Sequence, residues 1–254
     1  MKVVILAGGK GTRLTEETVL RPKPMVEIGG KPLLWHIMKI FSFYGLNEFI
    51  ICCGYKGYMI KEYFVNYSLH VSDVSIDLHK SKIELYNSRT EPWKISLIDT
   101  GVNTETGGRL KRISEYVKGE TFCFTYGDGV SDIDITKLIN FHHKQGKSAT
   151  LTAVRPSGRF GRLDIVDNQI ITFKEKPIDG EGWVNGGFFI LESKVLDLII
   201  DDQTIWENKP MEELSKKGQI TAYKHYGFWE AMDTIRDKEH LQYLWEQGDA
   251  KWIK

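Results

Sequence analysis

The stretch VVILAGGKGTRL, from Val3 to Leu14, decides the fold class of this chain. Its first part, Val3 to Leu6, is a short apolar run rich in β-branched residues, and a cluster of glycines follows directly. Such a run is typical of a strand that is buried on both faces, as in a parallel sheet. We therefore expect the chain to begin with a central strand whose carboxyl end opens into a glycine-rich loop.

The same pattern of strand and helix recurs along the first part of the chain. Further strands are predicted at Phe49 to Cys53, Ser96 to Asp99, Thr121 to Tyr126 and Ala149 to Val154. Apolar residues at helical spacing predict helices at Leu34 to Tyr44, Gly57 to Phe64, Leu110 to Val117 and Ile135 to His143. This alternation indicates an α/β fold with a doubly wound, mostly parallel, Rossmann-like sheet that has helices on both faces.

The pattern changes after Arg155, where a smaller mixed β region is expected in the C-terminal half. A hairpin is predicted from Leu163 to Phe173, followed by a strand at Gly186 to Leu191. We expect residues 1–254 to form a single domain with two portions, 1–154 and 155–254. The segment from Tyr67 to Trp93 does not fit the alternation, and its sequence is compatible with an edge hairpin, a lid or a subunit contact.

The composition excludes several classes of protein. The chain has 254 residues, 41% of them hydrophobic, and a formal net charge of zero, which is ordinary for a globular protein and argues against a nucleic-acid partner. Its three cysteines form a poor disulfide framework and lie in apolar runs, as buried reduced thiols do. We found no signal-peptide pattern or membrane-spanning stretch, so we expect a cytoplasmic protein without a membrane partner.

The glycine-rich loop and a nearby lysine have the chemistry of a phosphate site. Glycines after a strand let backbone N–H groups approach an anion, and Arg13 adds a planar fork of donors. Lys23 stands between Pro22 and Pro24, which restrict the backbone on both sides. The loop has neither the G-x-G-x-x-G spacing nor a Walker sequence, and taken alone it is equally compatible with a tight turn.

Two acidic residues are candidates for a metal site. Asp128, in Tyr126-Gly127-Asp128-Gly129, follows a predicted buried strand, and ligands bind at the carboxyl ends of strands in open α/β sheets. Asp233 precedes a predicted helix, so its local sequence fits a metal ligand or a helix N-cap equally well. Asp132 and Asp134 are expected to cap or solvate the following helix instead. Mg²⁺ is commonly held by one or two carboxylates together with substrate phosphates.

The sequence L-A-G-G-x-G-T-R-L, followed by Lys23-Pro24, resembles the sugar-phosphate nucleotidyltransferase family over essentially the whole chain. The resemblance implies that Arg13, Lys23, Asp128 and Asp233 are catalytic, and that Asp128 and Asp233 hold Mg²⁺. It further implies that portion 1–154 binds the nucleotide, through Leu6, Ala7, Gly8, Gly9, Lys10, Gly11, Thr12, Arg13, Lys23, Thr104, Thr106, Gly107, Arg109 and Gly127.

Two later segments resemble the part of this family that binds the sugar phosphate. They are the Glu-Lys-Pro at Glu175 to Pro177 and the run Val184 to Phe189. The resemblance implies that Lys176 contacts the phosphate and that Glu175, Asn185 and Gly186 lie at the sugar. Portion 155–254 would then be the sugar-phosphate portion.

The expected specificity for the base of the nucleotide depends on two differences from commoner members of the family. Thr15 to Thr18 contains no proline, and Arg109 stands where those members have a small residue. Arg109 can donate to the acceptors O2 and N3 of cytosine, whereas uracil and thymine carry N3–H. The alternative is that Arg109, Lys111 and Arg112 form a solvated helix face.

Together these features resemble family members that transfer a cytidylyl group from CTP to α-D-glucose 1-phosphate, giving CDP-glucose and pyrophosphate. The resemblance also implies a homo-oligomer and a place in the synthesis of CDP-linked deoxysugars for O-antigen and lipopolysaccharide. Two alternatives remain open at this point: a thymidylyl- or uridylyltransferase acting on a sugar 1-phosphate, and a non-catalytic nucleotide-binding sensor or regulatory subunit.

Overall fold

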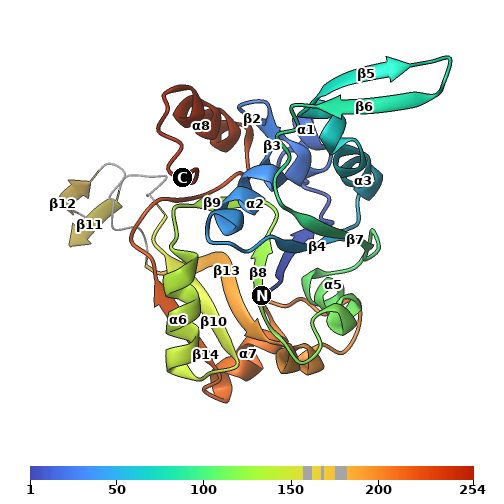
Figure 1. Cartoon of the computed structure of the whole chain (residues 1–254). Helices are drawn as coiled ribbons and strands as arrows, with labels where there is room; N and C mark the ends of the chain where they lie inside the picture. The colour runs from blue at the N-terminus through green and yellow to red at the C-terminus, as the bar shows by residue number, and fades with distance from the viewer. Residues whose placement is uncertain (157–161, 167–168, 175–181) are drawn as a thin grey trace.

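A seven-stranded sheet forms the centre of the molecule (Figure 1). The computed structural model describes residues 1–156, 162–166, 169–174 and 182–254. The strands run in the order β14-β10-β13-β8-β1-β4-β7. Their bounds are β1 Val3–Ala7, β4 Glu48–Cys53, β7 Lys94–Asp99, β8 Thr121–Tyr126, β10 Ala149–Val154, β13 Val184–Glu192 and β14 Ile220–Lys224.

The sheet is mostly parallel, which confirms the predicted α/β fold class. β1 pairs in parallel with β4 and β8, β4 with β7, and β10 with β14. β13 is antiparallel to both of its neighbours, β8 and β10. The later strands β13 and β14 therefore extend the main sheet, which joins the N-terminal and C-terminal parts of the chain in one structure.

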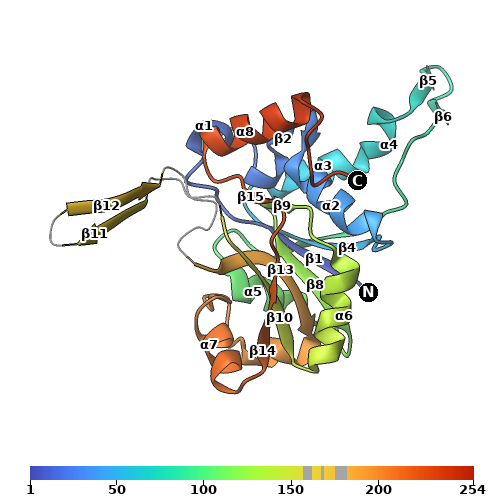
Figure 2. The same ribbon diagram turned by 90° about the vertical axis from the view of Figure 1, so that its left-hand side faces the viewer.

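Helices cover both faces of the sheet, as Figure 2 shows. Alternate residues of β1 explain why: Val3, Ile5 and Ala7 belong to one buried cluster, and Val4 and Leu6 belong to the other. The first cluster packs against α2 Leu33–Phe43, α3 Gly57–Val65, α6 Ile135–Gln145 and α8 Ile235–Glu246. The second packs against α5 Thr106–Arg112, η3 Ser193–Leu198 and α7 Lys209–Lys216.

Short pairs of antiparallel strands surround this core. They are β2 Glu27–Ile28 with β3 Lys31–Pro32, β5 Asp73–Asp77 with β6 Lys82–Tyr86, β9 Gly129–Ser131 with β15 Trp229–Ala231, and β11 Arg162–Val166 with β12 Gln169–Lys174. The remaining short helices are α1 Thr15–Thr18, η1 Lys23–Met25, α4 Tyr67–His70 and η2 Ser114–Tyr116. The strands β11 and β12 confirm the predicted hairpin in this part of the chain.

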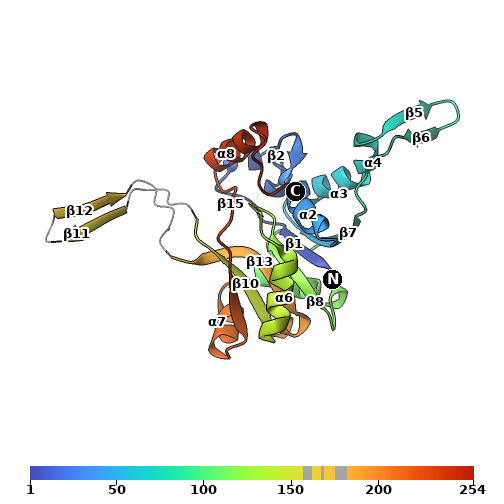
Figure 3. The same cartoon turned by 60° about the vertical axis from the view of Figure 1, so that its left-hand side comes forward.

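The segment from Tyr67 to Trp93, which the sequence left open, contains α4 and the hairpin β5–β6. Among the strands of the described residues, β5 and β6 pair only with each other, and the hairpin projects from the body of the molecule (Figure 3). It is therefore not an edge strand of the central sheet.

The three cysteines are buried free thiols, as predicted. Burial raises the pKa of Cys53 to about 11 and that of Cys123 to about 12. Among the described residues, no helix is long and apolar enough to cross a membrane.

Candidate active site

The candidate site lies where β1 and β8 end side by side. Leu6 of β1 pairs with Tyr126 of β8, so the glycine-rich loop after β1 begins next to Gly127 and Asp128. A Cβ atom on Gly127 would lie only 2.6 Å from the carbonyl oxygen of Leu6. Glycine is thus required at position 127 for the two strand ends to approach this closely.

A cleft of about 280 Å³ opens at this edge of the sheet. The residues that line it come from the glycine-rich loop, η1, the start of α5, the end of β8 and the segment before α8. They are Leu6, Ala7, Gly9, Gly11, Thr12, Arg13, Lys23, Pro24, Thr104, Glu105, Thr106, Arg109, Tyr126, Gly127, Asp128 and Asp233. The structure therefore brings together most of the residues that the sequence assigned to the nucleotide.

Two cations and two carboxylates meet in this cleft. The Lys23 Nζ lies 2.8 Å from Asp128 Oδ2 and 2.7 Å from Asp233 Oδ1. Arg13 Nη1 lies 2.8 Å from Asp233 Oδ2, and its side chain is 72% exposed. All four residues predicted to be catalytic thus form one connected cluster, although they are separated by up to 220 positions in the sequence.

The cluster holds Lys23 in its charged form. Burial opposes the charge, but the attraction and hydrogen bonds of Asp128 and Asp233 outweigh it and raise the pKa of Lys23. Lys23 begins the short helix η1, and Pro22 and Pro24 flank it. The position of the ammonium group is therefore restricted by its backbone as well as by the two carboxylates.

Strand pairing, and not helix capping, accounts for the position of Asp233. The N-cap of α8 is Thr234, which forms a capping box with Asp237. β15 pairs with β9, and the N–H of Met232 donates to the carbonyl of Asp128 at 2.8 Å. These contacts place Asp233 beside Asp128, and the alternative that Asp233 serves as the N-cap is wrong. Asp134 does cap α6, as predicted.

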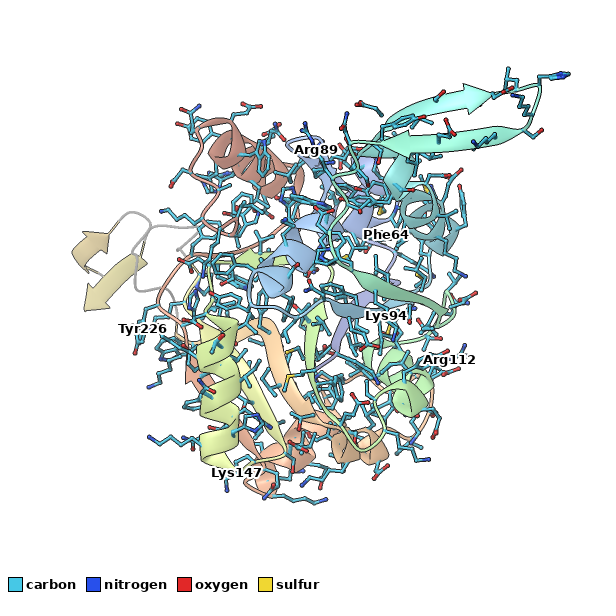
Figure 4. All side chains as sticks on the ribbon, in the orientation of Figure 1. Phe64, Arg89, Lys94, Arg112, Lys147 and Tyr226 are labelled. Carbon is cyan, nitrogen blue, oxygen red and sulfur yellow. The ribbon has the colours of Figure 1, made fainter. Side chains whose placement is uncertain are left out.

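Arg109 is buried against the glycine-rich loop and is only 4% exposed. Its Nη1 donates to Thr100 Oγ1 at 2.8 Å and to the Gly101 carbonyl at 2.7 Å, and its Nη2 donates to the Gly8 carbonyl at 3.0 Å. The alternative of a solvated face is therefore wrong for Arg109. It holds for Arg112, which pairs with Asp202 on the outside of α5 (Figure 4).

Three of the predicted nucleotide residues, Gly8, Lys10 and Gly107, are not among the residues that line the cleft. Gly8 contacts the guanidinium of Arg109, and Lys10 Nζ lies 3.2 Å from Asn103 Oδ1. Gly107 packs against the backbone of Thr204, where a Cβ atom would lie 2.6 Å from the carbonyl oxygen. These two glycines allow close packing around the cleft.

A second, smaller hollow of about 30 Å³ adjoins the cleft and contains the predicted sugar residues Asn185 and Gly186. Tyr126 and Asp128 line both hollows, which makes the two spaces neighbours. The other two predicted sugar residues, Glu175 and Lys176, lie outside the described residues.

The structure adds residues that sequence reasoning missed. Tyr126 and Glu105 line the cleft, and Trp229 Nε1 donates to the Gly186 carbonyl at 2.7 Å beside the smaller hollow. Glu207 binds both Tyr126 and Thr106 from behind the wall. The position of Tyr126 directly before Gly127-Asp128 was a usable signal, whereas Glu207 lies in no motif.

Comparison with known proteins shows the family of the chain. Residues 2–223 match the nucleotidyl transferase family, and the chain belongs to that family. Glucose-1-phosphate cytidylyltransferase of Salmonella typhi is 58% identical, with 99% of this chain and 98% of the relative covered. The probable glucose-1-phosphate cytidylyltransferase of Bacillus subtilis is 44% identical, with 99% of each chain covered.

The solved structures show the same fold. HddC from Yersinia pseudotuberculosis superposes with a TM-score of 0.71 at 24% identity, covering 96% of this chain and 99% of that chain. UDP-glucose pyrophosphorylase complexed with UDP-glucose gives a TM-score of 0.68 at 16% identity, covering 97% of this chain and 98% of the other.

Proposed function

We propose that this protein transfers a cytidylyl group from CTP to α-D-glucose 1-phosphate and releases pyrophosphate. The observation that carries the proposal is the cluster of Arg13, Lys23, Asp128 and Asp233 at the mouth of a glycine-lined cleft. The family and the 58% identity with a glucose-1-phosphate cytidylyltransferase over 99% of the chain support the choice of substrates.

The reaction exchanges one P–O bond for another. An oxygen of the sugar phosphate attacks the α-phosphorus of CTP, and the bond from that phosphorus to the bridging oxygen breaks as pyrophosphate leaves. Negative charge spreads over the phosphate oxygens, so catalysis depends on positioning and fixed cations. We assign the phosphates to the backbone of Gly9 and Gly11, and the developing charge to Arg13 and Lys23.

We assign Mg²⁺ to Asp128 and Asp233. Their carboxylate oxygens both contact the Lys23 ammonium, so in this arrangement the two acids already converge on one cation. Within the described part of the chain, no group of three or more His, Cys, Asp or Glu side chains could hold a metal. Mg²⁺ at this pair would therefore take further ligands from substrate phosphates and water, and it would supply charge stabilisation to them.

We assign the choice of cytosine to Arg109. A guanidinium has five N–H donors, so Arg109 can hold Thr100, Gly101 and Gly8 and still offer a donor to the base. Arg109→Ala should therefore reduce the ratio of kcat/KM for CTP over UTP. An unchanged ratio, whatever the absolute rates, would contradict this assignment.

We further propose that the protein is a homo-oligomer and that the hairpin β5–β6 forms a contact between subunits. On one face of the hairpin Val74 lies opposite Leu85, and Ile76 lies opposite Ile83. All four side chains are at least 37% exposed, and Figure 4 shows side chains of the hairpin pointing away from the body. Light scattering on an Ile76→Lys, Ile83→Lys variant tests this, since an unchanged mass would refute it.

We propose a cellular location from the cysteines and a biosynthetic role from the product. Three buried free thiols suit a reducing compartment, and we place the reaction in the cytoplasm. The product, a sugar activated by a nucleotide, suits the synthesis of deoxysugars for O-antigen and lipopolysaccharide.

The decisive experiment is a panel of CTP, UTP, dTTP and GTP against several sugar 1-phosphates, with pyrophosphate release as the readout and mass spectrometry of the product. We expect CTP with glucose 1-phosphate to give the highest kcat/KM, and CDP-glucose to be the product. Equal rates with UTP or dTTP would refute the base assignment. Binding of CTP without turnover would favour the alternative of a non-catalytic nucleotide-binding sensor or regulatory subunit.

Matched variants connect the reaction to the cluster. Asp128→Asn and Asp233→Asn should each reduce kcat by at least about a hundredfold, because each removes a charge that is used in the transition state. Asp249→Asn, an exposed acid that pairs with Lys251, is the control and should behave as the wild type.

A further inference from the structure

Glu207 links the two halves of the candidate active site. Thr106 Oγ1 donates to Glu207 Oε2 at 2.6 Å, and the hydroxyl of Tyr126 donates to Glu207 Oε1. The N–H of Trp206 in turn donates to Thr106 Oγ1 at 2.9 Å. The carboxylate of Glu207 thus binds Thr106, which lines the nucleotide cleft, and Tyr126, one of the residues that line both hollows.

The hydrogen bond to Glu207 decides what Tyr126 can offer to a ligand. Because the hydroxyl proton points to the carboxylate, the phenol oxygen is left as an acceptor for its other neighbours. Asn185 Nδ2 lies 3.4 Å from that oxygen, and Asn185 Oδ1 accepts the N–H of Gly187 at 2.9 Å. The side-chain amide of Asn185 is therefore oriented by contacts on both of its ends.

This chain of contacts ends at the smaller hollow. Tyr126, Asn185 and Gly187 line it, whereas Glu207 is not among the lining residues described for either space. The Tyr126 oxygen and the second N–H of Asn185 form an acceptor and a donor side by side. A sugar hydroxyl, which donates one hydrogen bond and accepts others, complements such a pair.

We propose that Glu207 is a positioning residue for the sugar: it fixes the Tyr126 hydroxyl as an acceptor and, through it, the Asn185 amide, so that the pair binds a hydroxyl of the sugar 1-phosphate. The inference rests on the proposed function, because it takes the smaller hollow as the sugar site. Glu207 acts only through Tyr126 and Thr106 and does not touch the substrate.

The test compares kinetic constants for the two substrates in Glu207→Gln, Tyr126→Phe and the double variant. The amide at position 207 can offer only one oxygen to the two hydroxyls that now bind the carboxylate. We expect Glu207→Gln to raise KM for the sugar 1-phosphate about tenfold. Thr106 keeps the N–H of Trp206 as a partner, so KM for the nucleotide should stay within about twofold. Glu213→Gln, a partly exposed residue of α7 that pairs with lysines, is the matched control.

The double variant separates positioning from a general structural effect. If Glu207 acts through Tyr126, Tyr126→Phe should raise the same KM, and the double variant should be no worse than the more impaired single variant. Additive effects, or equal increases in both KM values, would overturn the proposal. Tyr126→Phe retains the ring and its packing, so it tests the inference independently of how well Glu207→Gln folds.

The substrates used are those that wild-type enzyme accepts in the panel of nucleotides and sugar phosphates. Absence of wild-type turnover with every pair would refute the proposed function. Turnover by the wild type together with an unchanged sugar KM in both single variants would refute only the role of Glu207.

Discussion

His36 is expected to make the stability of this protein depend on pH. Its side chain is fully buried in α2, where Nε2 lies 2.8 Å from the Ile28 carbonyl and the indole N–H of Trp252 donates to Nδ1 at 3.2 Å. Both contacts suit a neutral imidazole that donates from Nε2. Burial lowers the pKa of His36 from 6.5 to about 4, with a smaller contribution from the charge of Lys31.

The size of the effect follows from the two pKa values. Since the folded protein favours neutral His36, its contribution is fully present above the unfolded pKa and is lost as the pH falls toward the folded one. At 1.36 kcal/mol per pKa unit, the loss is about 2 kcal/mol at about pH 5 and about 3 kcal/mol at about pH 4. A loss of this size is a large fraction of the stability of a typical domain.

The assay is urea unfolding between about pH 8 and pH 4, with His36→Gln as the comparison. Glutamine can donate to the Ile28 carbonyl and cannot titrate, so the variant should carry a constant offset at high pH. Carboxylates titrate in both proteins. The difference between the two curves of unfolding free energy against pH therefore isolates the contribution of His36. A difference that stays constant down to about pH 4.5 would show that His36 does not lower the stability in acid.

Three other perturbations test separate parts of the structure. Gly8→Ala should lower the free energy of unfolding by about 2 kcal/mol, because its Cβ would lie 2.1 Å from Arg109 Nη1. Gly9→Ala is the control, because its Cβ would have no described atom within 4 Å, and it should lower the free energy of unfolding far less. Thermal unfolding of the two variants measures the difference. Lys23→Ala should lower kcat by at least about a hundredfold while the exposed control Lys144→Ala retains activity, and equal rates would remove Lys23 from the mechanism. Native protein should react with a thiol reagent only on the unfolding timescale, since Cys52, Cys53 and Cys123 are buried with raised pKa values; rapid labelling of any of them would contradict the described packing.

The inner strands of the central sheet could be predicted because they are buried on both faces. A strand such as Thr121–Tyr126 has an apolar sequence that ends at glycines, and its predicted bounds agree with the structure. The same local signals failed for the segment from Tyr67 to Trp93. Its two strands form a separate two-stranded sheet that exposes both apolar and polar residues, so burial leaves no clear alternating pattern in the sequence.

The candidate site was predictable to the extent that its residues lie next to glycines and prolines. Lys23 and Asp128 belong to short motifs in which the neighbouring residues constrain the backbone. Asp233 was ambiguous, because a carboxylate before a helix fits a cap as well as a ligand. The capping box at Thr234 excludes the role of cap. The pairing of β15 with β9 places Asp233 beside Asp128, and such a long-range contact has no local signature.

Arg109 illustrates how one residue can serve the fold and the site together. Its guanidinium connects the carbonyl of Gly8 to the loop at Thr100 and Gly101, and the same side chain lines the cleft. A substitution there disturbs the position of the glycine-rich loop as well as any contact with the base. The absolute rate of an Arg109 variant therefore cannot identify its function, and only the ratio between competing nucleotides can separate recognition of the base from support of the loop.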